Sequence, residues 1–133
     1  MIIAVDFDGT IVEHKYPKIG REKPFAVDTL RRLASEGHKL ILWTSREGEL
    51  LEDAIRFCKE RGLSFYSVNS DTPLGSLNFS DKTTSTKLVA DVYIDDRNLG
   101  GLPDWGEIYE MVNGARRHKH RHKRSFFRRL FGL

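Results

Sequence analysis

The stretch Asp6-Phe7-Asp8-Gly9-Thr10 (DFDGT) decides how the rest of the chain is interpreted. Before it, Met1 to Val5 form an apolar, β-branched run, which predicts a buried strand. Side chains at i and i+2 of a strand point the same way, so Asp6 and Asp8 leave it on one side unless the backbone turns between them. Gly9 permits a sharp turn directly afterwards. Two carboxylates crowded at a strand end repel each other, and a hard divalent cation such as Mg²⁺ relieves that repulsion. A solvated acidic turn is the alternative interpretation.

Length and cysteine content restrict the class of protein. The chain has 133 residues, enough for one domain with a substantial core. It has one cysteine, Cys58, which excludes a disulfide framework, and helical spacing places this residue on a buried face. No apolar run approaches the ~20 residues that span a bilayer, and no signal peptide precedes the first predicted strand. We therefore expect a cytoplasmic protein.

The net charge of +3 conceals two oppositely charged regions. All 19 Asp and Glu lie in residues 1–115 together with 14 of the 22 Lys and Arg, which gives this region a net charge of −5. Residues 116–133 hold the other 8 basic residues and no acid, so their net charge is +8. The charge pattern predicts an acidic domain over residues 1–115 and a basic tail over residues 116–133.

Strand and helix patterns alternate along residues 1–115. Apolar runs predict further strands over 39–43 and 64–68 and a fourth strand within 88–94, and apolar residues at helical spacing predict helices over 24–36, 48–61 and 104–114. Pro24 suits the first position of a helix, and Gly37 and Gly62 suit the positions just after two helices. This alternation predicts an α/β fold with a central parallel sheet covered on both faces. Ligands of such folds bind at the carboxyl ends of the strands.

Side chains capable of chemistry lie at three of the predicted strand ends. They are Asp6 and Asp8 after the first strand, Thr44 and Ser45 after the second, and Asp95 and Asp96 after the fourth, which Lys87 precedes. Taken singly, Thr44 is a helix cap or turn residue, the paired aspartates a solvated turn, and Lys87 a surface lysine. Their joint occurrence at matching strand ends favours one common site.

With these motifs, residues 1–115 resemble the haloacid dehalogenase-like (HAD) hydrolase superfamily. The segment 6–10 matches the complete first motif, LILWTS at 40–45 the second, Lys87 the third, and YIDD at 93–96 the acidic fourth. The resemblance implies a three-layer α/β/α Rossmann-like sandwich. The intervals between the motifs leave no room for a cap domain, so the chain resembles a capless member with an open site. Such members act on large substrates or close the site with a neighbouring subunit, which makes a homo-oligomer possible.

The resemblance implies a Mg²⁺-dependent phosphatase that hydrolyses a phosphate monoester, most simply that of a small molecule. Asp6 would attack phosphorus and form an aspartyl phosphate. Asp8 would protonate the leaving oxygen and then activate water, a role that favours phosphatase over dehalogenase. Thr44 would hydrogen-bond the phosphoryl oxygens, and Lys87 would neutralise their charge.

The resemblance also implies a metal site and further phosphate contacts. Mg²⁺ would be held by Asp6, the backbone carbonyl of Asp8, and Asp95 or Asp96, since adjacent extended residues point to opposite sides. The remaining residues expected near the phosphate are Gly9, Ser45 and Arg46. Lys82 is the alternative to Lys87. The polar loop 13–23 is the candidate for contacting the leaving group, and Arg46 is a second candidate.

The tail permits several partners. Residues 116–124 (RRHKHRHKR) are densely basic, and residues 125–133 (SFFRRLFGL) place four apolar side chains at helical spacing. Such a segment could lie on an anionic membrane, bind nucleic acid, dock on the acidic domain, or be disordered. This keeps a second function open, a non-catalytic phosphate- or metal-binding or signalling module that the tail targets to membrane or nucleic acid. A receiver-like phosphoacceptor module is disfavoured, because the third strand ends in Val68-Asn69-Ser70 without an aspartate.

Overall fold

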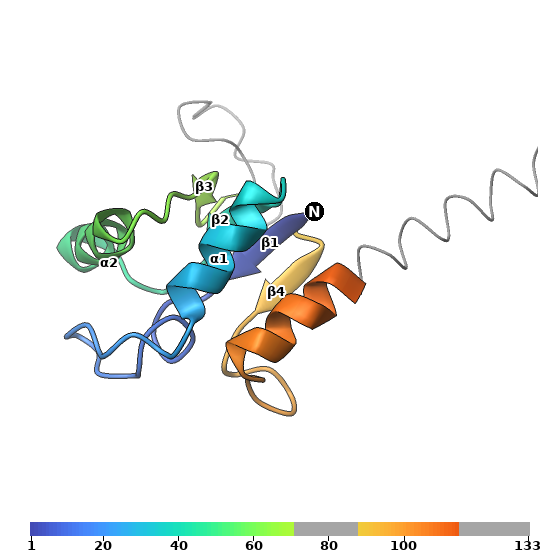
Figure 1. Cartoon of the computed structure of the whole chain (residues 1–133). Coiled ribbons are helices and arrows are strands. Elements are labelled where there is room, and N and C mark those ends of the chain that lie inside the picture. The colour runs from blue at the N-terminus through green and yellow to red at the C-terminus, as the bar shows by residue number, and fades with distance from the viewer. Residues whose placement is uncertain (71–87, 115–133) are drawn as a thin grey trace, which may run out of the picture. The chain divides into compact units, whose positions relative to one another are not determined.

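The computed structural model describes residues 1–70 and 88–114 (Figure 1). The chain divides between Leu102 and Pro103 into two units, and the first unit contains the sheet. The fold is α/β, as the alternating pattern predicted. The predicted basic tail, residues 116–133, lies outside the described residues.

The sheet has four parallel strands in the order β3-β2-β1-β4 (Figure 1). The strands are β1 (Ile2–Val5), β2 (Lys39–Leu42), β3 (Ser67–Val68) and β4 (Val92–Ile94). The first strand of the chain therefore lies inside the sheet, between β2 and β4. Its residues Ile3, Ala4 and Val5 are fully buried, which agrees with a strand predicted from an unbroken apolar run.

The register of the strands brings three of their carboxyl ends level. Val5 pairs with Leu42 of β2 on one side and with Ile94 of β4 on the other. The residues that follow these strands therefore meet at one edge of the sheet. This is the edge at which parallel α/β sheets bind their ligands.

The two outer strands are shorter than the apolar runs that predicted them. In the run 88–94 only Val92–Ile94 pair as a strand. The Tyr93 hydroxyl donates a hydrogen bond to the Leu88 carbonyl and accepts one from the Ala90 amide. These two backbone groups therefore bond a side chain and not a neighbouring strand. In the run 64–68 only Ser67 and Val68 are assigned to the strand, although the Tyr66 amide already donates to Leu40.

Two labelled helices belong to the same unit, α1 (Ala26–Ser35) and α2 (Gly48–Glu60). Figure 1 shows α1 crossing one face of the sheet. The prediction that α1 begins at Pro24 is wrong, because the next residue, Phe25, has a left-handed backbone (φ 64°) that no α-helical residue adopts. The Glu22 carboxylate instead accepts a hydrogen bond from the Val27 amide in the first turn (3.1 Å).

The carboxyl ends of both helices confirm the glycine predictions. Gly37 and Gly62 have left-handed φ values of 96° and 77°. In α1, the Gly37 amide donates to Ala34 and the His38 amide to Leu33, and α2 ends with the same pair of bonds. This is the Schellman arrangement, which satisfies carbonyls that the helix leaves without an intrahelical donor.

A third helix covers residues 105–114 in the second unit. Its predicted start is confirmed, because the Asp104 carboxylate accepts a hydrogen bond from the Glu107 amide (2.9 Å). Among the described residues, every helix is too short or too polar to cross a lipid bilayer.

Candidate functional site

The backbone turns immediately after β1. The Asp6 amide still continues the sheet by donating to the Ile94 carbonyl (2.9 Å), but the Phe7 carbonyl then accepts the amides of residues 10, 11 and 12. Gly9 lies in this turn with φ 84°. Because the chain turns here, the strand alternation that would point Asp6 and Asp8 together does not apply. Their carboxylates have different partners.

Asp6 belongs to an acidic cluster that also contains Asp95 and Asp96. One carboxylate oxygen from each of the three lies within 4.8 Å of the others. The cluster forms because β1 and β4 are neighbours and end level. Thr10, which is fully buried, holds it together. Its Oγ1 lies 3.2 Å from Asp6 Oδ2 and 3.3 Å from Asp96 Oδ1, and it accepts the Asp96 amide at 3.0 Å.

Both aspartates after β4 reach the cluster, although extended neighbours would point apart. The reason is a turn at this position, in which the Asp95 carboxylate accepts the Arg97 amide (2.9 Å) and the Asp95 carbonyl accepts the Asn98 amide (3.3 Å). Asp95 lines an open cleft. Asp96 lies against Gly9, where a Cβ would be only 2.3 Å from Asp96 Oδ2.

The three carboxylates of the cluster concentrate negative charge in a partly buried place, as a cation site does. Burial, and after it the negative charge of Asp95, raises the pKa of Asp6 from 3.8 to about 7. The atoms available as metal ligands are all carboxylate oxygens, which hard cations prefer. The three residues can therefore hold a metal ion, and a cation would remove the repulsion that raises the Asp6 pKa.

Asp8 forms an ion pair with Arg46. Arg46 Nε lies 2.7 Å from Asp8 Oδ2, and Nη2 lies 2.8 Å from Asp8 Oδ1. The Arg46 side chain is 0% exposed and the Asp8 side chain 12% exposed. Arg46 was expected beside a phosphate, but here its guanidinium donates to Asp8 and to backbone carbonyls.

Thr44 and Ser45 follow β2 at the same edge, as expected, and both line the cleft. The Thr44 amide donates to the side-chain oxygen of Asn69 (2.8 Å), and Thr44 Oγ1 accepts the Arg46 amide (3.1 Å). Asn69 adopts a left-handed backbone (φ 50°) directly after β3, which asparagine tolerates. The sequence contains no local pattern that predicts this support from Asn69.

The cleft has a volume of about 590 Å³. Its lining residues are Asp6, Asp8, His14, Tyr16, Trp43, Thr44, Ser45, Asp95 and Arg97. His14 comes from the loop 13–23 that was expected to meet the leaving group. Sequence reasoning gave no role to Trp43 or Arg97, and it included Tyr16 only as part of the loop 13–23. Trp43 had a detectable signal, since it directly follows β2, and its ring packs on Tyr93 with centroids 5.3 Å apart.

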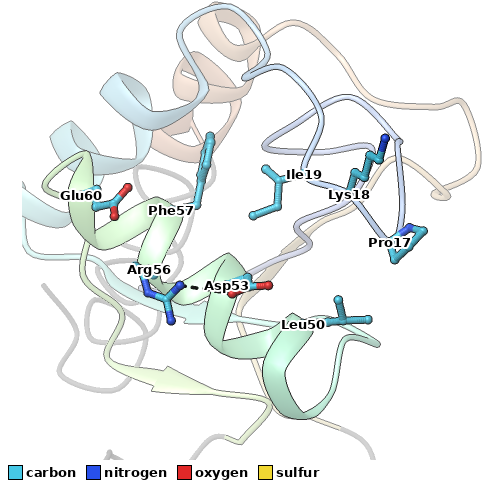
Figure 2. Close-up of a pocket in the computed structure, with 8 residues that line it drawn as sticks. All are labelled: Pro17, Lys18, Ile19, Leu50, Asp53, Arg56, Phe57 and Glu60. Carbon is cyan, nitrogen blue, oxygen red and sulfur yellow. Dashed lines mark hydrogen bonds and ion pairs between the residues drawn. The ribbon is translucent and has the colours of Figure 1, made fainter.

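A second hollow of about 580 Å³ lies between the loop 17–19 and α2 (Figure 2). Its lining residues are Pro17, Lys18, Ile19, Leu50, Asp53, Arg56, Phe57 and Glu60. Asp53 is paired with Arg56 (3.3 Å) at the surface. We place the candidate site at the first cleft, because the acidic cluster, Asp8 and Thr44 meet there.

Lys87 and its alternative Lys82 lie outside the described residues, so their predicted role stays a prediction. The same holds for the basic tail.

Comparison with known proteins identifies one relative. Neither protein-family models nor curated proteins gave a match. Among solved structures, a conserved protein from Bacteroides thetaiotaomicron is 60% identical to this chain, with a TM-score of 0.79 over 86% of this chain and 90% of that one. The chain belongs to the family of this conserved protein. The match supports the α/β fold of the family.

Proposed function

We propose that the protein is a Mg²⁺-dependent phosphatase of the HAD type that hydrolyses a phosphate monoester through an aspartyl phosphate on Asp6. The observation that supports this best is the acidic cluster at the level ends of β1 and β4, beside a cleft that also contains Asp8 and Thr44. In this proposal the fold is a three-layer Rossmann-like sandwich without a cap domain, and the substrate is a phosphorylated small molecule.

Mg²⁺ would be held by Asp6 together with Asp95 or Asp96 or both, and by the Asp8 carbonyl. The three carboxylates fit a hard cation because they are close together, partly buried and supported by Thr10. The bound ion would screen the repulsion between the anionic nucleophile and the anionic phosphate. It would also favour the ionised form of Asp6 at neutral pH, and the ionised carboxylate is the form that attacks phosphorus.

The chain's own residues divide the reaction between them. An Asp6 oxygen forms a bond to phosphorus while the bond from phosphorus to the leaving oxygen breaks, and Asp8 gives that oxygen a proton. Water then attacks the phosphorus, Asp8 takes a proton from the water, and the bond to Asp6 breaks. Thr44 is suited to donate to a phosphoryl oxygen, because its Oγ1 already accepts the Arg46 amide and its own proton remains for the cleft. Lys87 is proposed to neutralise phosphate charge.

The leaving group would lie against the remaining lining of the cleft. His14 and Tyr16 come from the loop after β1, and Trp43 and Arg97 come from the ends of β2 and β4. Tyr16 is half-exposed and Trp43 is 37% exposed, so both rings present apolar surface to an incoming molecule.

The test is hydrolysis of p-nitrophenyl phosphate with and without Mg²⁺, by the wild type, Asp6→Asn and the control Asp28→Asn. Asp28 is an exposed acid in the first turn of α1. We expect metal-dependent turnover by the wild type and the control, and none by Asp6→Asn. Equal rates for Asp6→Asn and wild type would overturn the proposal. Cation binding without turnover of any phosphate ester would favour the non-catalytic alternative.

A further inference from the structure

Arg46 is the largest fully buried side chain among the described residues. Burying a guanidinium is costly unless its donors are satisfied. Two of its five N–H groups bond the Asp8 carboxylate, and the other three bond the carbonyls of Pro17 (3.3 Å), Lys18 (3.0 Å) and Leu50 (3.3 Å). Every guanidinium donor is therefore used inside the protein.

These bonds join three separate parts of the fold. Asp8 belongs to the turn after β1, Pro17 and Lys18 to the loop beside the cleft, and Leu50 to the first turn of α2. The three carbonyl-bearing residues line the second hollow, where Figure 2 shows them on the loop and on the facing helix. Arg46 thus connects that loop and helix to a carboxylate that lines the cleft.

The geometry fixes the orientation of Asp8. A guanidinium that bonds both oxygens of one carboxylate holds the carboxylate plane, because rotation about the last side-chain bond would break one hydrogen bond. The guanidinium also contacts two aromatic rings, because the ring centroids of Phe7 and Tyr16 each lie 5.2 Å from its central carbon. A lysine in its place could offer one contact point but not this planar fork.

We propose that Arg46 is a positioning residue for Asp8. It holds the carboxylate in a fixed orientation at the cleft and ties it to the loop expected to meet the leaving group. This proposal rests on the proposed phosphatase function, in which Asp8 transfers the protons. It assigns Arg46 a role different from the direct phosphate contact expected from the sequence.

The two chemical steps depend on Asp8 to different degrees. p-Nitrophenolate leaves without needing a proton, so formation of the aspartyl phosphate from p-nitrophenyl phosphate should tolerate a misplaced Asp8. Hydrolysis of the aspartyl phosphate needs Asp8 to take a proton from water. A positioning role therefore predicts a first turnover that survives and later turnovers that slow down.

The experiment compares the full-length wild type with Arg46→Lys and Arg46→Met in saturating Mg²⁺, following p-nitrophenol release in the first seconds and at steady state. We expect both variants to release about one equivalent of p-nitrophenol per chain and then to turn over about 10²-fold more slowly than the wild type, with KM changed little. Arg46→Lys should not rescue the rate, because it restores the charge without the fork.

Three outcomes would overturn the proposal. An increased KM with unchanged kcat would make Arg46 a direct phosphate ligand. Wild-type kinetics of Arg46→Lys would show that the fork is unnecessary. Equal additional slowing by Arg46→Lys in wild type and in Asp8→Asn would show that Arg46 does not act through Asp8.

A measurement on the wild type covers the case in which the variants do not fold. With orthovanadate bound as an analogue of the phosphate, the Arg46 Nε–H should remain protected from hydrogen exchange in NMR spectra. Loss of that protection would contradict a fixed orientation during reaction. If the wild type itself shows no turnover of phosphate esters, the proposed function fails, and the positioning role fails with it.

Discussion

Two structural features of position 9 require glycine. Its φ of 84° is left-handed, and a Cβ there would be 2.3 Å from Asp96 Oδ2 and 2.7 Å from Asp96 Cγ. The atoms in the way belong to a short side chain, which can rotate aside. A substitution would therefore displace a member of the acidic cluster more readily than it would unfold the chain.

We accordingly predict that Gly9→Ala abolishes cation-dependent stabilisation and activity. The matched control is Gly37→Ala, where φ is 96° but nothing lies within 4 Å of the added Cβ. Both variants should lose about 1–2 kcal/mol in the free energy of unfolding from the left-handed backbone. Urea unfolding with and without Mg²⁺ measures both effects, and a Gly9→Ala variant stabilised by Mg²⁺ as strongly as the control would contradict the prediction.

The raised pKa of Asp6 predicts that the stability of the metal-free chain depends on pH. Burial, and then the charge of Asp95, raises its pKa from 3.8 to about 7. Between about pH 4 and pH 7 the folded chain thus keeps a proton that the unfolded chain loses, so the contribution of Asp6 to the free energy of unfolding falls as the pH rises through this window. Asp6→Asn removes the titrating group and should not show that fall.

Urea unfolding of the wild type and Asp6→Asn at several pH values tests this difference. Without a divalent cation, the wild type should lose stability relative to Asp6→Asn between pH 4 and pH 7. Saturating Mg²⁺ should reduce the loss, because it favours ionised Asp6. A difference between the two chains that stays constant with pH would contradict the assigned pKa.

At the scale of elements, the sequence predicted the order and type of the strands and helices, and its errors are at their ends. The carboxyl ends of α1 and α2 were predictable, because Gly37 and Gly62 are residues that a left-handed cap requires. The start of α1 was not, because Phe25 adopts a left-handed backbone that phenylalanine rarely takes. The fourth strand lies within 88–94 as predicted, but its start at Val92 was not predictable, since the Tyr93 hydroxyl bonds the backbone of Leu88 and Ala90.

A buried cysteine in α2 allows the opening of this helix to be measured by thiol labelling. Cys58 is the only cysteine and is 0% exposed on the buried face of the helix, as its spacing predicted. Burial raises the pKa of the Cys58 thiol to about 12, so little reactive thiolate exists near pH 8.

We predict that an aromatic disulfide reagent at pH 8 modifies Cys58 only when α2 opens. Labelling of the native chain should be at least about 10³-fold slower than labelling of the urea-unfolded chain, in line with typical protein stabilities. Absorbance of the released thiolate follows both rates. Similar rates in the two states would mean that α2 does not bury this face in solution.

At the scale of the whole molecule, the meeting of three strand ends at one edge was predictable, but the partners of Asp8 were not. A parallel sheet places the carboxyl ends of its strands at one edge, and the motifs placed Asp6, Thr44 and the aspartates after β4 there. The pairing of Asp8 with Arg46 joins residues 38 positions apart and has no periodic signal. The turn after β1, which gives Asp6 and Asp8 different partners, is closed by hydrogen bonds from the amides of residues 10–12 to the Phe7 carbonyl, and a strand pattern does not contain these bonds.

The division of charge predicts the effect of removing residues 116–133. The acidic cluster and the cleft lie entirely before residue 98, so a chain ending at residue 115 should keep its kcat. Its net charge falls from +3 to −5, which should raise KM for an anionic substrate at low salt, and the effect should vanish at high salt because ions screen it. Steady-state kinetics at two ionic strengths measure both quantities, and loss of kcat would show that the tail contributes to the site.

The position of β1 between β2 and β4 also determines when the sheet can be completed during synthesis of the chain. Val5 pairs with Ile94, which is added about 90 residues later, a delay of roughly 5–18 s at ~5–20 residues per second. Until then the nascent chain exposes one edge of its most apolar strand, the kind of edge that promotes association between chains. The residues that complete the acidic cluster, Asp95 and Asp96, are added directly after Ile94, so the cluster can form only once that edge can be covered.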